Sequence, residues 1–115
     1  MNDSRFLQVF VTVPNAELAN QIASQMVEDR LAACVQVIGP IRSVYRWQGN
    51  IESSEEWLLV LKTDGASWPT LRERIVALHS YEVPEILALP ISDGHPPYLQ
   101  WLADSLSPDR SIEKT

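Results

Sequence analysis

Cysteine and basic residues are scarce in this chain, and both shortages limit what the protein can do. Cys34 is the only cysteine among 115 residues, so no internal disulfide can form, which agrees with a reducing compartment. Nine Lys and Arg against fifteen Asp and Glu give a formal net charge of −6. Because nucleic acids and anionic membranes are bound by neutralising phosphate charge, neither is an expected partner.

The sequence also lacks long apolar runs. None approaches the roughly 20 residues that span a bilayer, and the opening residues MNDSRFLQ have neither the basic start nor the apolar stretch of a signal peptide. We therefore expect a cytoplasmic protein. The hydrophobic content of 45% is ordinary for a globular chain, so residues 1–115 are expected to form one domain, with its core over about 6–106 and a polar tail at 107–115.

Residues 34–63 read as two β-rich runs joined at Gly49-Asn50, which suits a two-residue hairpin turn. This turn would place Trp47 opposite Glu52 and Val44 opposite Glu55. Strands of this length extend about 43 Å, whereas a compact chain of this size is about 35 Å across. The hairpin should therefore project from its own domain as an arm, and its apolar surface should be covered by another subunit.

The remaining elements follow from periodicity and from glycine and proline signals. Gly39-Pro40 indicates a bulge or bend in the first hairpin strand, about ten residues before the turn. We expect a strand at 6–13, a helix from an Asn15 cap to about 30 and a helix from a Ser67 cap to about 79. A strand at 83–90, bracketed by prolines, should be short or at a sheet edge. A last helix is expected at 97–106, with a face of Tyr98, Leu99, Trp101, Leu102 and Leu106.

This order predicts an α+β, ferredoxin-like fold: βαββαβ plus a C-terminal helix, with an antiparallel sheet that carries its helices on one face. The uncovered sheet face is a second reason to expect an oligomer.

Several stretches together resemble the divalent-cation tolerance family, CutA. They are LAACV at 31–35, YRWQG at 45–49 followed by Ile51-Glu52, LKT at 61–63, YEVPEI at 81–86 and PPYLQW at 96–101. The resemblance covers about residues 7–106. It implies a homotrimer whose subunits pair strands edge to edge, an architecture similar to PII signalling proteins, and a role in tolerance of copper and other divalent metals. The residues themselves include no recognisable catalytic constellation, so an enzyme is the least expected function and we expect no enzyme activity.

The chain departs from the family at positions that bear on metal binding. His79-Ser80-Tyr81 stands where relatives often have His-Pro-Tyr, and Val11 and Leu78 stand where some copper-binding relatives have a cysteine and a second histidine. Only His79 carries over as a metal ligand. It could coordinate Cu²⁺ or a similar ion through its imidazole, or it could cap the last carbonyls of the helix that it ends.

Lys62, Tyr81, Glu82 and Glu85 form a second candidate group, which could line an inter-subunit cleft and hold a small polar ligand or a cation. The alternative is a structural ion pair with Lys62 and a tyrosine hydroxyl bonded to the backbone. The pair Glu55-Glu56 is read as a solvated face.

Cys34 is expected to be a small buried hydrophobe rather than a reactive thiol. Trp57 and Trp68 are expected to pack in the core, and Trp101 lies on a helix face. Tyr45, Trp47 and Trp101 are the candidate trimer-interface residues, with Trp47 near the hairpin tip as the anchor. The leading prediction is thus a homotrimer that binds divalent metal weakly, and the alternative is a PII-like signalling or small-ligand module.

Overall fold

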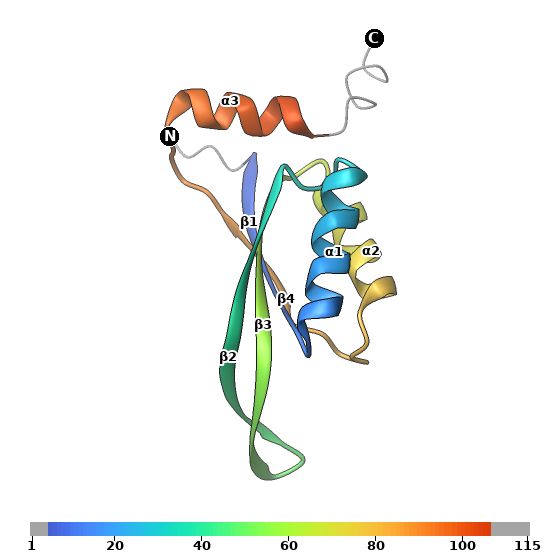
Figure 1. Ribbon diagram of the computed structural model, residues 1–115. Helices are drawn as coiled ribbons and strands as arrows, with labels where there is room; N and C mark the ends of the chain where they lie inside the picture. Colours follow the sequence, from blue (N-terminus) through green and yellow to red (C-terminus); the bar gives the residue numbers. More distant parts are fainter. Residues whose placement is uncertain (1–4, 107–115) are drawn as a thin grey trace.

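Seven elements follow one another in the computed structural model, which describes residues 5–106 (Figure 1). The predicted tail at 107–115 lies outside these residues. The four strands form one antiparallel sheet in the order β2-β3-β1-β4, which confirms the α+β class. The elements are β1 (Phe6–Val13), α1 (Ala16–Glu28), β2 (Cys34–Trp47), β3 (Asn50–Asp64), α2 (Trp68–Leu78), β4 (Ile86–Pro90) and α3 (Pro96–Ser105).

The main core lies between the sheet and the helices α1 and α2, which run side by side on one face (Figure 1). Side chains alternate between the faces of a strand, so Val9 and Val11 of β1 point the same way as their partners Leu61 and Leu59 of β3. Helix α3 lies across one end of the sheet instead (Figure 1). There Leu102 and Leu106 pack against Phe6 and Ala33 in a second, smaller cluster. The fully buried residues of the main core also include Ala19, Ile22, Met26, Leu71 and Ile75.

Local capping sets where the two long helices begin. The Asn15 side chain accepts a hydrogen bond from the Leu18 N–H at 2.8 Å, as predicted. Ser67 stands at the N-cap of α2, but its side chain makes no cap bond. Asp64 takes that role in part, because its carboxylate accepts from the Ser67 N–H at 2.9 Å. The start of α2 is therefore fixed by the residue that ends β3.

The sheet face opposite α1 and α2 carries exposed apolar side chains. Ile38 is 48% exposed, Leu87 55% and Leu89 44%. Leu87 pairs with Phe10, so both belong to the strand positions that alternate with the buried core positions. No helix among the described elements covers these residues, and this matches the expectation that α1 and α2 occupy one face only.

The hairpin of β2 and β3 projects beyond the rest of the sheet (Figure 1). Strand β1 pairs with β3 only over residues 57–64, and residues 50–56 continue past its end while pairing with β2. The molecule is accordingly elongated, 52 Å in its longest dimension and 29 by 22 Å in the others. The predicted projecting arm is confirmed, and we use the name arm for residues 41–56.

The turn of the arm lies one residue earlier than predicted. Its central residues are Gln48 and Gly49, both with positive φ (50° and 84°), whereas Gly49-Asn50 was expected. Such a turn needs a positive φ at both central residues. Glycine adopts the larger φ, at the second central position, without strain. Trp47 therefore faces Asn50, so each arm residue meets a partner two positions earlier than predicted. Because the error is two residues, the face of each side chain is unchanged.

The predicted bulge is present in β2. The register shifts between Ile38 and Ile41, where two residues of β2 oppose one of β3. Gly39 is needed there because a Cβ atom on it would overlap the ring of Trp57. Trp57 in turn packs against the main core. The bulge therefore joins the arm to the domain through a close contact between backbone and indole.

Two predicted boundaries near the C-terminus need correction. Strand β4 begins at Ile86 rather than at residue 83, because Pro84 has no N–H to donate and also restrains the residue before it. Its edge position is confirmed. On α3 only part of the predicted face is buried: Tyr98 is 41% exposed and Trp101 46%. These two aromatic rings lie against each other, with centroids 5.4 Å apart.

Candidate functional site

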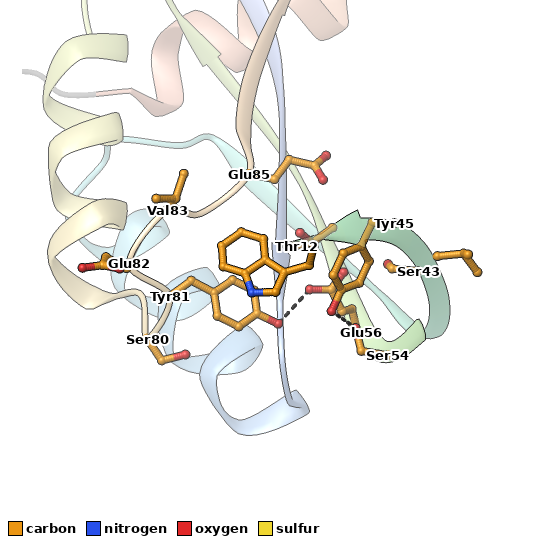
Figure 2. A pocket seen from close by; sticks show the side chains of 12 residues that line it. Thr12, Ser43, Tyr45, Ser54, Glu56, Ser80, Tyr81, Glu82, Val83 and Glu85 are labelled. Carbon is orange, nitrogen blue, oxygen red and sulfur yellow. Dashed lines mark hydrogen bonds between the residues drawn. The ribbon is translucent and has the colours of Figure 1, made fainter. Parts of the chain in front are cut away.

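A pocket of about 770 Å³ lies where the arm leaves the domain (Figure 2). Its walls come from β1, from both strands of the arm and from the connection between α2 and β4. No Lys, Arg or His is among the described residues that line it. The side chains that give the pocket its chemistry are three aromatic rings, Tyr45, Trp47 and Tyr81, and three carboxylates, Glu56, Glu82 and Glu85.

A hydrogen bond joins Tyr81 of the connection to Glu56 of the arm. The tyrosine hydroxyl donates to Glu56 Oε2 over 2.8 Å (Figure 2). The pKa of Tyr81 is raised above its ordinary value, mainly because the side chain is partly buried and, to a smaller extent, because of this hydrogen bond to a carboxylate. Glu56 is only 8% exposed. Its other oxygen, Oε1, receives no hydrogen bond within the described chain and is not among the fully enclosed atoms, so it can accept a hydrogen bond from a ligand in the pocket.

His79 links the backbone of Tyr81 to that of β1. Its Nδ1 accepts a hydrogen bond from the Tyr81 N–H at 3.0 Å, so the proton lies on Nε2, which donates to the Thr12 carbonyl at 2.7 Å. The side chain is 8% exposed, and its ring centroid is 4.8 Å from that of Tyr81. The histidine thus bonds to β1 and does not cap the carbonyls of α2, which was the alternative considered from sequence. A metal ion could reach an imidazole nitrogen only by replacing one of these bonds.

The structure brings together three of the four residues of the predicted cleft. Tyr81, Glu82 and Glu85 line the pocket, but Lys62 does not; its Nζ donates to Gln36 Oε1 over 3.1 Å. Helix α2 explains the separation, since its eleven residues carry the chain about 16 Å back along the sheet. The sequence interpretation missed Glu56, which it treated as part of a solvated pair. Strand alternation could have indicated that one of two adjacent glutamates points inward, but not which one.

The candidate interface residues are exposed in the single chain. Tyr45 is 43% exposed, Trp47 57% and Trp101 46%. Trp57 and Trp68 pack against the main core, as predicted. The prediction for Cys34 needs correction, because the residue is only half-buried and its Sγ lies 3.7 Å from the Tyr98 hydroxyl.

The described residues offer little that resembles a metal-binding site. Across residues 5–106, no three His, Cys, Asp or Glu side chains are grouped closely enough to hold a metal ion. The pocket carboxylates therefore surround a space and do not converge on a point. Among the same residues, no helix has the length and apolar character needed to cross a membrane.

The two shifted tyrosines predict a loss of stability in alkali. Partial burial, with a contribution from the Cys34 thiol, raises the pKa of Tyr98 to about 12. A phenol whose pKa is higher in the folded than in the unfolded chain contributes its full stability below the unfolded value of about 10 and loses it as the pH rises toward the folded value. We expect urea unfolding at pH 9 and pH 11 to show a smaller decrease in the free energy of unfolding for Tyr98→Phe, and for Tyr81→Phe, than for wild type. Equal decreases in all three would contradict this.

Three comparisons with known proteins agree with one another. Residues 7–105 match the family model described as CutA1 divalent ion tolerance protein. The divalent-cation tolerance protein CutA of Thermus thermophilus is 50% identical over 97 residues, which are 84% of this chain and 94% of that protein. Protein CutA of Mus musculus is 48% identical over 81% of this chain, but this chain spans only about half (52%) of its length. A solved structure of the divalent cation tolerance protein from Thermus thermophilus superposes with a TM-score of 0.87 at 47% identity, covering 89% of this chain and 99% of that one.

Proposed function

Because the chain belongs to the CutA1 divalent ion tolerance family, we propose that it acts in copper tolerance by binding Cu²⁺ weakly, without catalysing a reaction. The observation that carries this proposal is the family match over residues 7–105. The acidic pocket supports it, because carboxylate oxygens are ligands for divalent ions. Weak binding is expected because the described residues include no ready-made group of three ligands.

Glu82 and Glu85 are the ligands that we propose for the ion. Both line the pocket on the connection after α2. Glu56 shares its carboxylate with Tyr81, and both ring nitrogens of His79 already have partners. Two carboxylates and water molecules would make a loose, mainly electrostatic site.

Calorimetric titration with Cu²⁺ tests this assignment. We expect the double variant Glu82→Gln/Glu85→Gln to lose most of the wild-type binding heat, since both oxygen ligands lose their charge. The matched control is Glu17→Gln/Glu73→Gln, which changes the net charge equally at exposed positions outside the pocket. Equal heats in the two double variants would refute the pocket site, and no heat in wild type would refute Cu²⁺ binding altogether.

We also propose a cytoplasmic homotrimer of ferredoxin-like subunits. The element order and the strand order β2-β3-β1-β4 support the ferredoxin-like arrangement. The exposed arm, the open edges at β2 and β4 and the apolar sheet face support the assembly, with Tyr45, Trp47 and Trp101 as proposed interface residues. The acidic composition and single cysteine support the location.

A second candidate function is PII-like binding of a small molecule. The observation that favours it is the pocket itself, because about 770 Å³ lies within the range of small-molecule sites, roughly 300–1,000 Å³. Aromatic walls and a few polar groups are also typical of such sites. In a homotrimer with Tyr45 and Trp47 at the interface, this pocket would lie at the border between subunits.

A further inference from the structure

We propose that the pocket binds an organic cation, namely a protonated amine attached to an apolar or aromatic body. This inference rests on the second proposed function, small-molecule binding, and specifies the class of ligand. It depends on the charge, the aromatic walls and the size of the pocket.

The charge of the pocket selects against anions. Glu56, Glu82 and Glu85 line it without a Lys, Arg or His among the described lining residues. A carboxylate or phosphate ligand would meet like charge on these walls and no compensating cation. Glu56 adds a direct recognition group, because its side chain is 8% exposed and Oε1 receives no hydrogen bond from the described chain. An ammonium N–H is a suitable donor for this accessible carboxylate oxygen.

The aromatic walls favour an organic cation over a hydrated metal ion. Tyr45, Trp47 and Tyr81 all line the pocket. A ring face attracts a cation electrostatically, and the attraction is stronger when the cation is desolvated. The same rings provide apolar surface for the body of the ligand, and in the single chain 57% of the surface of Trp47 is exposed. Hydrogen bonds fix two of the rings, Tyr81 through Glu56 and Tyr45 through Ser54 at 3.3 Å.

The size of the pocket points the same way. A volume of about 770 Å³ far exceeds what one metal ion occupies, and within residues 5–106 no three potential ligands are close enough to enclose one. Carboxylates spread around a large, aromatic-walled space can instead contact different parts of one molecule. A metal at Glu82 and Glu85 would use only one side of this space.

A pair of probes with similar shape and opposite charge tests the proposal. Phenethylamine is a cation at pH 7, and phenylacetate is an anion with a similar body. We expect titration calorimetry on the whole chain to show phenethylamine binding at least about tenfold tighter than phenylacetate, in line with a charge-selective site. Added NaCl should weaken phenethylamine binding, because salt screens partly exposed charges.

Variants at Tyr81 separate the ring from the hydroxyl. Tyr81→Phe and Tyr81→Leu both remove the hydrogen bond to Glu56, but only the leucine variant removes the ring. We expect Tyr81→Phe to bind phenethylamine as well as wild type or better, and Tyr81→Leu to bind it about three- to tenfold more weakly. Glu85→Gln should also weaken binding, whereas Glu73→Gln on the exposed surface of α2 should not.

Several outcomes would overturn the inference: equal affinity for the two probes, no binding of phenethylamine, or equal affinity in the Phe and Leu variants when circular dichroism shows both to be folded. The same measurements distinguish a failure of this inference from a failure of either proposed function. Stabilisation by a neutral or anionic molecule, lost in Tyr81→Leu, would preserve small-molecule binding and exclude an organic cation. Cu²⁺ heat that depends on Glu82 and Glu85 without phenethylamine binding would preserve the metal proposal alone.

Discussion

Replacing Trp47 and Ile51 together by serine is expected to reduce the mass in solution from three times 13.0 kDa to that of one 13.0 kDa chain. In the single chain these side chains are 57% and 64% exposed. They belong to adjacent cross-strand pairs of the arm, since Trp47 pairs with Asn50 and Ile51 with Arg46, so they project from opposite faces and the arm's own domain cannot cover both. Burial of such a side chain contributes about 1.5–3 kcal/mol, so two losses per subunit should weaken assembly by several powers of ten.

Light scattering at micromolar protein concentration measures this effect. The matched control is Val27→Ser/Val76→Ser, which removes two exposed apolar side chains from α1 and α2 instead of the arm. It should keep the wild-type mass. A wild-type protein that scatters as a single 13.0 kDa chain would refute the homotrimer. An arm variant that keeps the trimer mass would show that the arm does not hold the assembly together.

The arm shows which parts of a hairpin a sequence specifies well. Its length and its bulge could be predicted because an uninterrupted β-rich stretch and Gly39-Pro40 are local signals. Its register could not, because Gly49 suits either position of a two-residue turn when asparagine follows and glutamine precedes it. One residue of ambiguity at the turn became two residues in every cross-strand pair of the arm. The choice between the two registers depends on all the cross-strand pairs of the hairpin together, and not on the turn residues alone.

The candidate site was predictable to the extent that its residues are neighbours in sequence. Tyr81, Glu82 and Glu85 belong to one connection, so their grouping needed no knowledge of the sheet. Lys62 and Glu56 required that knowledge. Both lie on β3, six residues or about 20 Å apart, and the direction of α2 brings the connection beside Glu56 instead of Lys62. The family resemblance identified the chain, but it did not indicate that Glu56, and not Lys62, would line the pocket.

The pocket and the proposed interface share Tyr45 and Trp47, and this overlap has a consequence. The same rings that would be covered by a neighbouring subunit also form walls of the pocket. A ligand held there would contact the assembly and could bind differently to the trimer and to the single chain. Any ligand titration should therefore be accompanied by a mass measurement at the same protein concentration.

Replacing His79 by leucine is expected to lower the free energy of unfolding by about 2–5 kcal/mol, because it removes both hydrogen bonds that this buried side chain makes to the backbone. The Thr12 carbonyl would lose the hydrogen bond from Nε2, and the Tyr81 N–H would lose its acceptor Nδ1. Leucine fills a similar volume, so the effect reports mainly on hydrogen bonding. The connection that carries Tyr81 into the pocket would also lose its anchor to β1, so weaker phenethylamine binding is expected in addition.

The exposed His95 provides the matched control, since His95→Leu makes the same chemical change without removing a hydrogen bond from its side chain in the described structure. We expect it to change stability by less than about 0.5 kcal/mol. Urea denaturation of the three proteins at one concentration measures the difference, and Cu²⁺ titration under folding conditions separates the two roles of His79. A structural histidine predicts a large loss of stability with part of the Cu²⁺ heat retained, because Glu82 and Glu85 remain on a connection that has only lost its anchor. A normal stability with the Cu²⁺ heat abolished would instead make His79 a metal ligand and require its two hydrogen bonds to be dispensable.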